Sequence, residues 1–364
     1  MVLAMERRDP QKPLPAALAW SAPAETLKGL TAGECASVAA WLDGDAYARA
    51  HPRLQAWARR GWFSVASAWC RARLAERGIA VTGEAAQVKH WFIAAILRVP
   101  TERGAAWFKA VPTIFAHECS LLALIGPSMP EHLPRVIATD PARGWTLMDA
   151  IPALTLRERP EQAEEAAALL ARLHITWAGR ERELFGAGCA DRRLGTLQPG
   201  LAAILAREDV TSRFSAAECA RLDAFCASIP ARVEALSACG MPDTLIHGDF
   251  HRGNVATGSA APVIFDWTDG CISHPLFDLA TFLPDDDPVE RAARLHAYFA
   301  PWTRRLDEAV LDRAWAIAEP LAYVHHAISY MRIMDATDPA DLWEFDSDPL
   351  FWLRWLHDIA SDSA

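Results

Sequence analysis

The chain has 364 residues, of which 52% are hydrophobic and 23% are charged. This composition is typical of a globular protein and excludes a disordered or fibrous one. The 36 Lys and Arg residues stand against 46 Asp and Glu residues, which gives a net charge of −10. Because that sign repels phosphate backbones, nucleic acid is not expected to be a principal ligand.

Several features predict a cytoplasmic protein with two lobes and no membrane partner. At about 150 residues per domain, the length predicts two domains. The longest apolar stretch, Trp91–Leu97, is far shorter than the roughly 18 residues of a membrane span. The first residues carry charges where a secretory signal would have an apolar core. The eight cysteines include no Cys-x-x-Cys pair, which argues against a zinc site and is typical of a reducing compartment.

The first 151 residues are expected to mix helices and strands. Apolar residues three and four apart predict helices near 31–50, 62–78 and 112–125, of which the second ends at Gly78 and the third at Gly126. Runs that contain β-branched and aromatic residues predict strands within 87–99, 105–111, 135–139 and 144–151. The turn-rich segment 100–104 separates the first two of these runs, so a hairpin is expected there.

From Pro160 onward the pattern is mainly helical. Helical spacing is present at 160–178, 216–238, 288–299, 307–334 and 350–360. A β-type interruption falls at 245–266. A β-rich first part followed by a helical second part predicts an α+β, two-lobed fold with a cleft between the lobes.

The residues that carry chemistry lie in and after the segment Leu245–Val255. Asp249 and Asn254 are five residues apart across a loop that contains glycine, and Asp266 ends an apolar strand. If 255–257 and 262–265 pair as a hairpin, Asp266 returns to lie beside Asn254. Carboxylate and amide oxygens are ligands that Mg²⁺ prefers, so the sequence predicts a magnesium site.

An Asp followed five residues later by an Asn resembles the catalytic loop of protein kinases. The variant His247-Gly-Asp-x-His251-x-x-Asn254, followed by Asp266-Trp267, is similar to the aminoglycoside phosphotransferase family, a group of small-molecule kinases with the protein-kinase-like fold. The run Pro-Leu-Phe-Asp278-Leu-Ala is also similar to that family. The resemblance implies that Asp278 and His247 support the catalytic loop.

The resemblance implies a bilobal fold of class α+β with three regions. Residues 1–80 would be an arm and helices that precede or pack on the small lobe. Residues 81–151 would form the N-lobe, a nucleotide-binding β-sheet with a helix. Residues 152–364 would form the C-lobe, with the catalytic loop and the helices that bind the acceptor.

The same resemblance implies a nucleotide site in the small lobe. Lys109 lies in an apolar run, and Glu118 follows nine residues later near the start of a helix. Paired with that carboxylate, the Lys109 ammonium would contact the phosphates of ATP or GTP. The segment that holds Met148 and Ala150 would be the hinge strand that contacts the base through its backbone.

The implied reaction is transfer of the γ-phosphoryl group to a hydroxyl group of a small molecule. Asp249 would orient the hydroxyl and accept its proton, with His251 in the same loop. Asn254 and Asp266 would hold Mg²⁺ as the cofactor. The implied partners are therefore a nucleotide and a small-molecule acceptor, and the sequence does not predict an oligomeric state.

Several alternatives stay open at this point. The acceptor could be an aminoglycoside or another antibiotic, or a metabolic alcohol such as choline, homoserine or a sugar. Protein kinases have a Gly-rich loop over the phosphates, but the corresponding stretch, 89–95, has no glycine. This departure keeps a nucleotide-binding pseudokinase module as a second class. The acidic run 285–287 is either the start of a helix or part of a pocket for a polycationic substrate.

Overall fold

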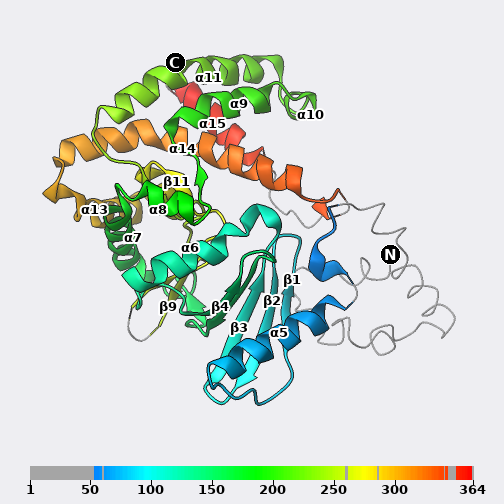
Figure 1. The fold of residues 1–364 in the computed structure, drawn as a ribbon. Helices are drawn as coiled ribbons and strands as arrows, with labels where there is room; N and C mark the ends of the chain where they lie inside the picture. Colours follow the sequence, from blue (N-terminus) through cyan, green and yellow to red (C-terminus); the bar gives the residue numbers. More distant parts are fainter. Residues whose placement is uncertain are drawn as a thin grey trace. The chain divides into compact units, whose positions relative to one another are not determined.

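The computed structural model describes residues 53–59, 61–258, 261–284, 287–339, 341–342 and 350–362 (Figure 1). The chain divides into two compact units. The first unit includes the chain up to Cys119, together with Pro134–Ala150 and Asp335–Asp346; the second unit includes Ser120–Leu133 and Ile151–Met334, and takes in the end of the chain. The helix predicted at 31–50 lies outside the described residues.

The first unit contains a five-stranded antiparallel sheet with the strand order β1-β2-β3-β5-β4. Its strands are β1 (Ala86–His90), β2 (Ala95–Thr101), β3 (Gly104–Ala110), β4 (Val136–Asp140) and β5 (Trp145–Asp149). The predicted hairpin is confirmed as β2–β3. The run 87–99 contains most of β1 and of β2, and the chain reverses within 89–95, the stretch expected to correspond to the phosphate loop of protein kinases. The reversal between His90 and Ala95 is closed by a hydrogen bond from the Trp91 N–H to the Ala94 carbonyl (2.9 Å).

The helix predicted at 62–78 is confirmed as α5 (Trp62–Glu76), and it covers one face of this sheet (Figure 1). Its buried side chains, which include Trp62 and Leu74, form one core cluster with Leu97, Phe108 and Leu147 of the sheet. The helix ends before Gly78, whose φ of 66° is a backbone conformation that glycine adopts without strain. Because side chains alternate along a strand, the residues between these core positions point to the opposite face of the sheet.

The chain after β3 forms the helix that was predicted at 112–125. A 3-10 turn, Thr113–Phe115, precedes α6 (His117–Ile125), and a second one, Gly126–Ser128, follows it. Pro127 lies in the first turn of that second 3-10 helix, where proline costs no hydrogen bond. Glu118 therefore lies in the first turn of α6.

The second unit is mainly helical. Its helices are α7 (Ala163–Trp177), α8 (Glu181–Gly186), α9 (Leu197–Leu205), α10 (Glu208–Thr211), α11 (Ala216–Ser237), α12 (Leu279–Phe282), α13 (Pro288–Phe299), α14 (Glu308–Ala336) and α15 (Phe351–Asp362), and α14 belongs to this unit up to Met334. The five helices expected from the periodicity correspond to α7, α11, α13, α14 and α15. Within the described part of the chain, no helix combines the length and the apolar character needed to cross a membrane.

Two small sheets of the second unit flank the segment that carries the chemistry. One has the order β10-β9-β6, with β6 (Leu154–Thr155), β9 (Val255–Thr257) and β10 (Val263–Ile264); the other has the order β7-β11-β8, with β7 (Ala190–Asp191), β8 (Thr244–Ile246) and β11 (Cys271–Ser273). The antiparallel pairing of β9 with β10 confirms the predicted hairpin. The loop 247–254 therefore runs from the end of a strand in one sheet to the start of a strand in the other.

Candidate active site

Lys109 and Glu118 form a buried ion pair in the first unit. The distance from Lys109 Nζ to Glu118 Oε1 is 2.7 Å, and the two residues are 8% and 1% exposed. Removing an ammonium from water is costly unless a carboxylate stabilises it, so the two side chains position each other. β3 carries the lysine and the first turn of α6 carries the glutamate.

The predicted hinge residues lie at the end of β5. Lys109 is paired with Thr146 across the β3–β5 ladder, and Trp107 is paired with Met148. Because alternate residues share a face, Met148 lies on the same face of the sheet as Lys109, the face opposite α5. Ala150 follows the last residue of β5 and is exposed.

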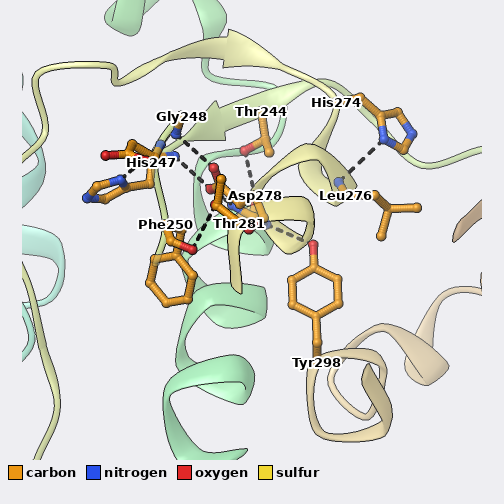
Figure 2. Close-up of polar contacts among 11 residues, drawn as sticks. Thr244, His247, Gly248, Phe250, His274, Leu276, Asp278, Thr281 and Tyr298 are labelled. Atoms are coloured by element: carbon orange, nitrogen blue, oxygen red, sulfur yellow. Dashed lines mark hydrogen bonds and ion pairs between the residues drawn. The ribbon is translucent and has the colours of Figure 1, made fainter. Parts of the chain in front are cut away.

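In the second unit, the Asp278 carboxylate holds the start of the loop 247–254 (Figure 2). Asp278 Oδ2 accepts a hydrogen bond from the backbone N–H of His247, and Oδ1 accepts one from the N–H of Gly248, each at 2.7 Å. Gly248 has a φ of 80°, and a Cβ atom there would lie 2.3 Å from the Asp269 carbonyl oxygen. Only glycine therefore fits at this position.

Two further buried side chains stabilise the Asp278 carboxylate: His174 contacts it, and Tyr298 in turn contacts His174. His174 Nε2 is 3.1 Å from Asp278 Oδ2, and His174 Nδ1 is 2.8 Å from the hydroxyl oxygen of Tyr298. Since a carboxylate only accepts, Nε2 carries the proton and Tyr298 donates to Nδ1. Burial alone would raise the pKa of Asp278, but the hydrogen bonds from His174 Nε2 and from the backbone N–H of His247 outweigh it and lower that pKa.

Asp249 and Asn254 are joined within the loop. The Asn254 side-chain N–H groups donate to the Asp249 carbonyl oxygen (2.9 Å) and to Asp249 Oδ2 (3.3 Å). The amide oxygen of Asn254 is therefore the atom left to meet a cation. His251 Nδ1 accepts from the Gly253 N–H (2.9 Å), and His251 Nε2 lies 3.5 Å from Asp249 Oδ2.

The loop concentrates negative charge. Desolvation and the nearby charges of Asp266 and Asp278 raise the pKa of Asp249 to about 7. Desolvation lowers the pKa of His247 and of His251, so both histidines are neutral. His247 Nε2 donates to the Phe265 carbonyl (2.9 Å), and its Nδ1 accepts from the Asp249 N–H (3.3 Å). A positive ion would relieve the repulsion among the three carboxylates.

Asp266 lies two residues after the end of β10, with Phe265 between them. The Phe265 N–H donates to the Asn254 carbonyl (3.0 Å), which brings Asp266 next to the backbone of the loop. Asp266 has a φ of 67°, and it is the one non-glycine residue with positive φ in the part of the chain that the structure describes. The Thr268 hydroxyl donates to Asp266 Oδ1 (3.1 Å). Backbone strain of this kind is typical of functional positions.

The donor set fits Mg²⁺ held jointly with phosphates. Among the described residues there is no cluster of three or more His, Cys, Asp or Glu side chains suited to a metal. Mg²⁺ usually takes one or two protein carboxylates and fills its other positions with phosphate and water oxygens. One carboxylate, Asp266, and one amide oxygen, Asn254, agree with that pattern.

Sequence reasoning missed several residues around the loop. Asp269 Oδ1 is buried without a hydrogen-bond partner among the described residues and lies 3.8 Å from Arg192 Nη1; desolvation raises the pKa of Asp269 to about 7. Arg157 lies so close to the loop that a Cβ atom at Gly253 would be 2.9 Å from its Nε. Asp269 lies three positions after Asp266 in the sequence, and this closeness was the one sequence feature that could have indicated its place near the loop.

The acidic run beyond α12 is in part a helix start. Asp287 Oδ1 accepts hydrogen bonds from the N–H groups of Val289 (3.0 Å) and Glu290 (2.9 Å), which caps α13. Asp285 and Asp286 lie outside the described residues. For Asp287 the capping interpretation is confirmed.

A family profile described as the phosphotransferase enzyme family matches residues 80–310. The chain belongs to this family. The resemblance expected from the loop motif is therefore confirmed, and the matched stretch includes both Lys109 and the loop 247–254. A search of curated proteins finds no significant match to this phosphotransferase.

Solved structures with this fold include kinases for different acceptors. An APH(2'')-IIia structure in complex with GDP and kanamycin is 14% identical, with a TM-score of 0.54, and the match covers 80% of this chain and 95% of that one. Ethanolamine kinase from Plasmodium vivax is 11% identical, with a TM-score of 0.56 and coverage of 76% and 82%. A putative fructosamine-3-kinase from Thermobifida fusca is 19% identical, with a TM-score of 0.53 and coverage of 81% and 96%.

These findings confirm the α+β, protein-kinase-like fold of this phosphotransferase and its assignment as an enzyme. The family and its structural neighbours are small-molecule kinases that act on hydroxyl groups, and they use a nucleotide as co-substrate. The neighbours differ in their acceptors, so the shared fold does not identify an acceptor for this chain.

Proposed function

We propose that this phosphotransferase transfers the γ-phosphoryl group of ATP or GTP to a hydroxyl group of a small molecule. The observation that carries the proposal is the loop 247–254, in which Asp249 and Asn254 are joined by hydrogen bonds and the Asp278 carboxylate fixes the backbone. Phosphoryl transfer passes through a loose, in-line transition state, so positioning and charge neutralisation supply most of the catalysis. A rigid loop that presents a carboxylate suits that requirement.

Lys109 anchors the nucleotide phosphates, and Glu118 fixes the direction of the Lys109 ammonium. The 2.7 Å ion pair supports this role, since a buried lysine with one fixed partner presents its remaining N–H groups in a defined direction. Met148 and Ala150 contact the base, from the end of β5. The base is adenine or guanine.

Asp249 orients the acceptor hydroxyl and accepts its proton as the bond to phosphorus forms. A carboxylate held in place by the Asn254 side chain can accept that proton as the transfer proceeds. His251, from within the same loop, positions Asp249. His247 supports the loop through its contacts with the Asp249 N–H and the Phe265 carbonyl. Asn254 and Asp266 hold Mg²⁺, which when bound neutralises charge on the phosphates.

The proposal gives a role to each of the three regions expected from the sequence. Residues 81–151 form the nucleotide-binding lobe, and residues 152–364 form the lobe that holds the catalytic loop and the acceptor. Residues 1–80 precede the nucleotide-binding lobe, and α5 within them packs on its sheet.

Two alanine variants and one matched control test the proposal. Asp249→Ala should lower the rate of acceptor phosphorylation by about 100-fold or more, the usual contribution of a general base, while nucleotide binding stays measurable. Asp266→Ala should weaken Mg²⁺-dependent nucleotide binding itself. Asp312→Ala removes an exposed carboxylate of the same unit and should change neither. Near wild-type turnover by Asp249→Ala would overturn the assignment.

A screen of hydroxyl compounds identifies the acceptor. Kanamycin, a macrolide, choline, ethanolamine, homoserine, a fructosamine and simple sugars represent the antibiotic and metabolic classes. Acceptor-dependent release of ADP or GDP identifies the substrate class. Nucleotide binding without turnover on any acceptor would instead favour a pseudokinase module, the class that the glycine-free turn at 89–95 keeps open.

A further inference from the structure

Lys89 lies on the same face of the sheet as Lys109. The strand registers pair Lys89 with Ile96, Ile96 with Lys109, and Lys109 with Thr146. Residues that are directly paired in antiparallel strands point to the same face, so these four residues form one row across the sheet. α5 packs on the other face. Neighbouring strands are about 4.8 Å apart, so the backbones of the two lysines are about 10 Å apart.

The Lys89 ammonium is held at the turn between β1 and β2. Lys89 is exposed, and its Nζ lies 4.1 Å from the centroid of the Trp91 ring. A cation over an aromatic face at this distance is attracted by the ring, so the ammonium is directed toward the turn. Lysine is rare in this chain, with four residues against 32 arginines, yet two of the four lie in this one row.

A segment that precedes the family match anchors the same turn. The indole N–H of Trp57 donates to the Trp91 carbonyl (2.7 Å), and His90 Nε2 lies 3.4 Å from the Trp57 carbonyl oxygen. Trp57 itself is buried, with its ring 6.3 Å from that of Trp62. The turn therefore has a fixed backbone, in contrast to the adaptable backbone of a glycine-rich loop.

We propose that Lys89 is a second phosphate-binding ammonium, which contacts the terminal phosphates of the nucleotide from the β1–β2 turn. Trp91 holds the side chain, and Trp57 holds the turn. A triphosphate carries several negative charges along its length, so two ammonium groups on one face bind it better than one. This inference rests on the proposed function, since it places the nucleotide on the Lys109 face.

A purely structural role makes a different prediction. β1 is an edge strand of the sheet, and lysine on an edge strand discourages pairing with other chains. If that is the whole role of Lys89, its replacement should leave nucleotide affinity unchanged. The two roles can be distinguished by comparing the affinities for ligands that carry different numbers of phosphate groups.

The experiment measures dissociation constants for ATP, ADP and adenosine, and for the guanine series, on the full chain with Mg²⁺ by calorimetry. Lys89→Gln should weaken triphosphate binding about tenfold, which corresponds to one charge-assisted contact, and should leave nucleoside binding unchanged. Lys89→Arg should keep most of the affinity. Arg103→Gln removes one positive charge at the opposite end of β2 and should have no effect. Equal weakening of ATP and adenosine by Lys89→Gln, or no weakening at all, would overturn the inference.

A second variant tests the anchor. Trp57→Phe keeps a ring but removes the N–H that donates to the Trp91 carbonyl, so triphosphate affinity should fall while nucleoside affinity is kept. An unchanged triphosphate affinity in this variant would refute the anchoring role. If the wild-type chain binds no nucleotide, the proposed function fails; if it binds nucleotide and Lys89→Gln binds equally well, only this inference fails.

Discussion

The Asp278 carboxylate accepts hydrogen bonds from two successive backbone N–H groups and from His174. It lies outside the loop 247–254, yet it determines where that loop begins, and the loop carries Asn254, one of the two residues proposed to bind Mg²⁺. Its three donors come from two elements, the loop 247–254 and α7. At the scale of single residues, the position of Asp249 therefore depends on a carboxylate 29 residues further along the chain.

Asp278→Asn should reduce both stability and activity. The amide would direct an N–H group toward a backbone N–H, and the lost charge-assisted hydrogen bonds are worth about 1.5–3 kcal/mol each before relaxation. We expect a loss of about 2–4 kcal/mol in the free energy of unfolding, measured by denaturant titration, and a lower kcat. Asp312→Asn is the control on an exposed carboxylate. A variant with wild-type kcat would show that the loop does not depend on this contact.

Gly248→Ala should destabilise the protein by about 1–3 kcal/mol or more, since its φ of 80° strains any other residue and the added Cβ would meet the Asp269 carbonyl oxygen at 2.3 Å. A backbone atom cannot move aside as the end of a side chain can. Gly195 has neither a positive φ nor an atom within 4 Å of the added Cβ, so Gly195→Ala is the matched control. Thermal unfolding of both variants measures the difference. Equal melting temperatures would contradict the strain argument.

At the scale of elements, the apolar periodicity of the sequence predicted the long helices and not the short ones. α7, α11, α13 and α14 are long enough for several repeats of the apolar spacing, and each was predicted. α8, α10 and α12 have four to six residues, too few for a repeat to be visible. The reversal between β1 and β2 was located near 89–95 only through the resemblance to protein kinases, because Trp91 to Ala94 are apolar and contain none of the usual turn residues.

The site was predicted as far as its motif extends. The loop 247–254 and Asp266 lie within a short stretch of sequence whose spacing predicted that they belong together, and the family resemblance added Asp278. His174, Tyr298 and Arg157 were not predicted, because no local pattern links residues that meet only through packing of distant elements. Contacts of that kind become visible only when α7 and α13 are placed in space.

Tyr298→Phe tests the contact between α13 and α7. It removes the hydroxyl that donates to His174 Nδ1 and leaves that buried nitrogen unpaired, which should cost about 1–3 kcal/mol of unfolding free energy. We expect a lower melting temperature and a modest fall in kcat, because His174 also fixes Asp278. Thr303→Val removes an exposed hydroxyl and serves as the control. An unchanged melting temperature would contradict a stabilising role for the Tyr298 hydroxyl and would leave the contact with Asp278 as the side-chain contact that fixes His174.

At the scale of the whole molecule, stability should depend on buried neutral histidines. Burial lowers the pKa of His274 to about 3 and that of His326 to about 4, and lowers the pKa of His325 far below its usual range. In the unfolded chain these groups titrate near 6.5. The unfolded state therefore binds more protons than the folded state below that value, and stability falls with falling pH.

Denaturant titrations at pH 7.5, 6.5 and 5.5 should show this loss. Each such histidine contributes up to about 1.4 kcal/mol per pH unit once the pH is below about 6.5. His326→Gln should reduce the slope relative to the wild type, whereas His296→Gln, which changes an exposed histidine, should leave it unchanged. The raised pKa values of Asp249 and Asp269 act in the opposite direction over this range, so the comparison between variants decides: an equal slope for His326→Gln and the wild type would contradict the neutral, buried state of His326.

Because lysine is scarce in this chain, the amine of Lys89 can be used as a chemical probe of nucleotide binding. Lys89 and Lys109 are the two lysines of the described residues, and they share a sheet face, one exposed and one buried. An amine-selective acylating reagent would thus modify Lys89 far faster than Lys109. If a nucleotide engages the exposed amine, saturating nucleotide will slow its acylation, and peptide mass spectrometry can follow occupancy without knowledge of the acceptor.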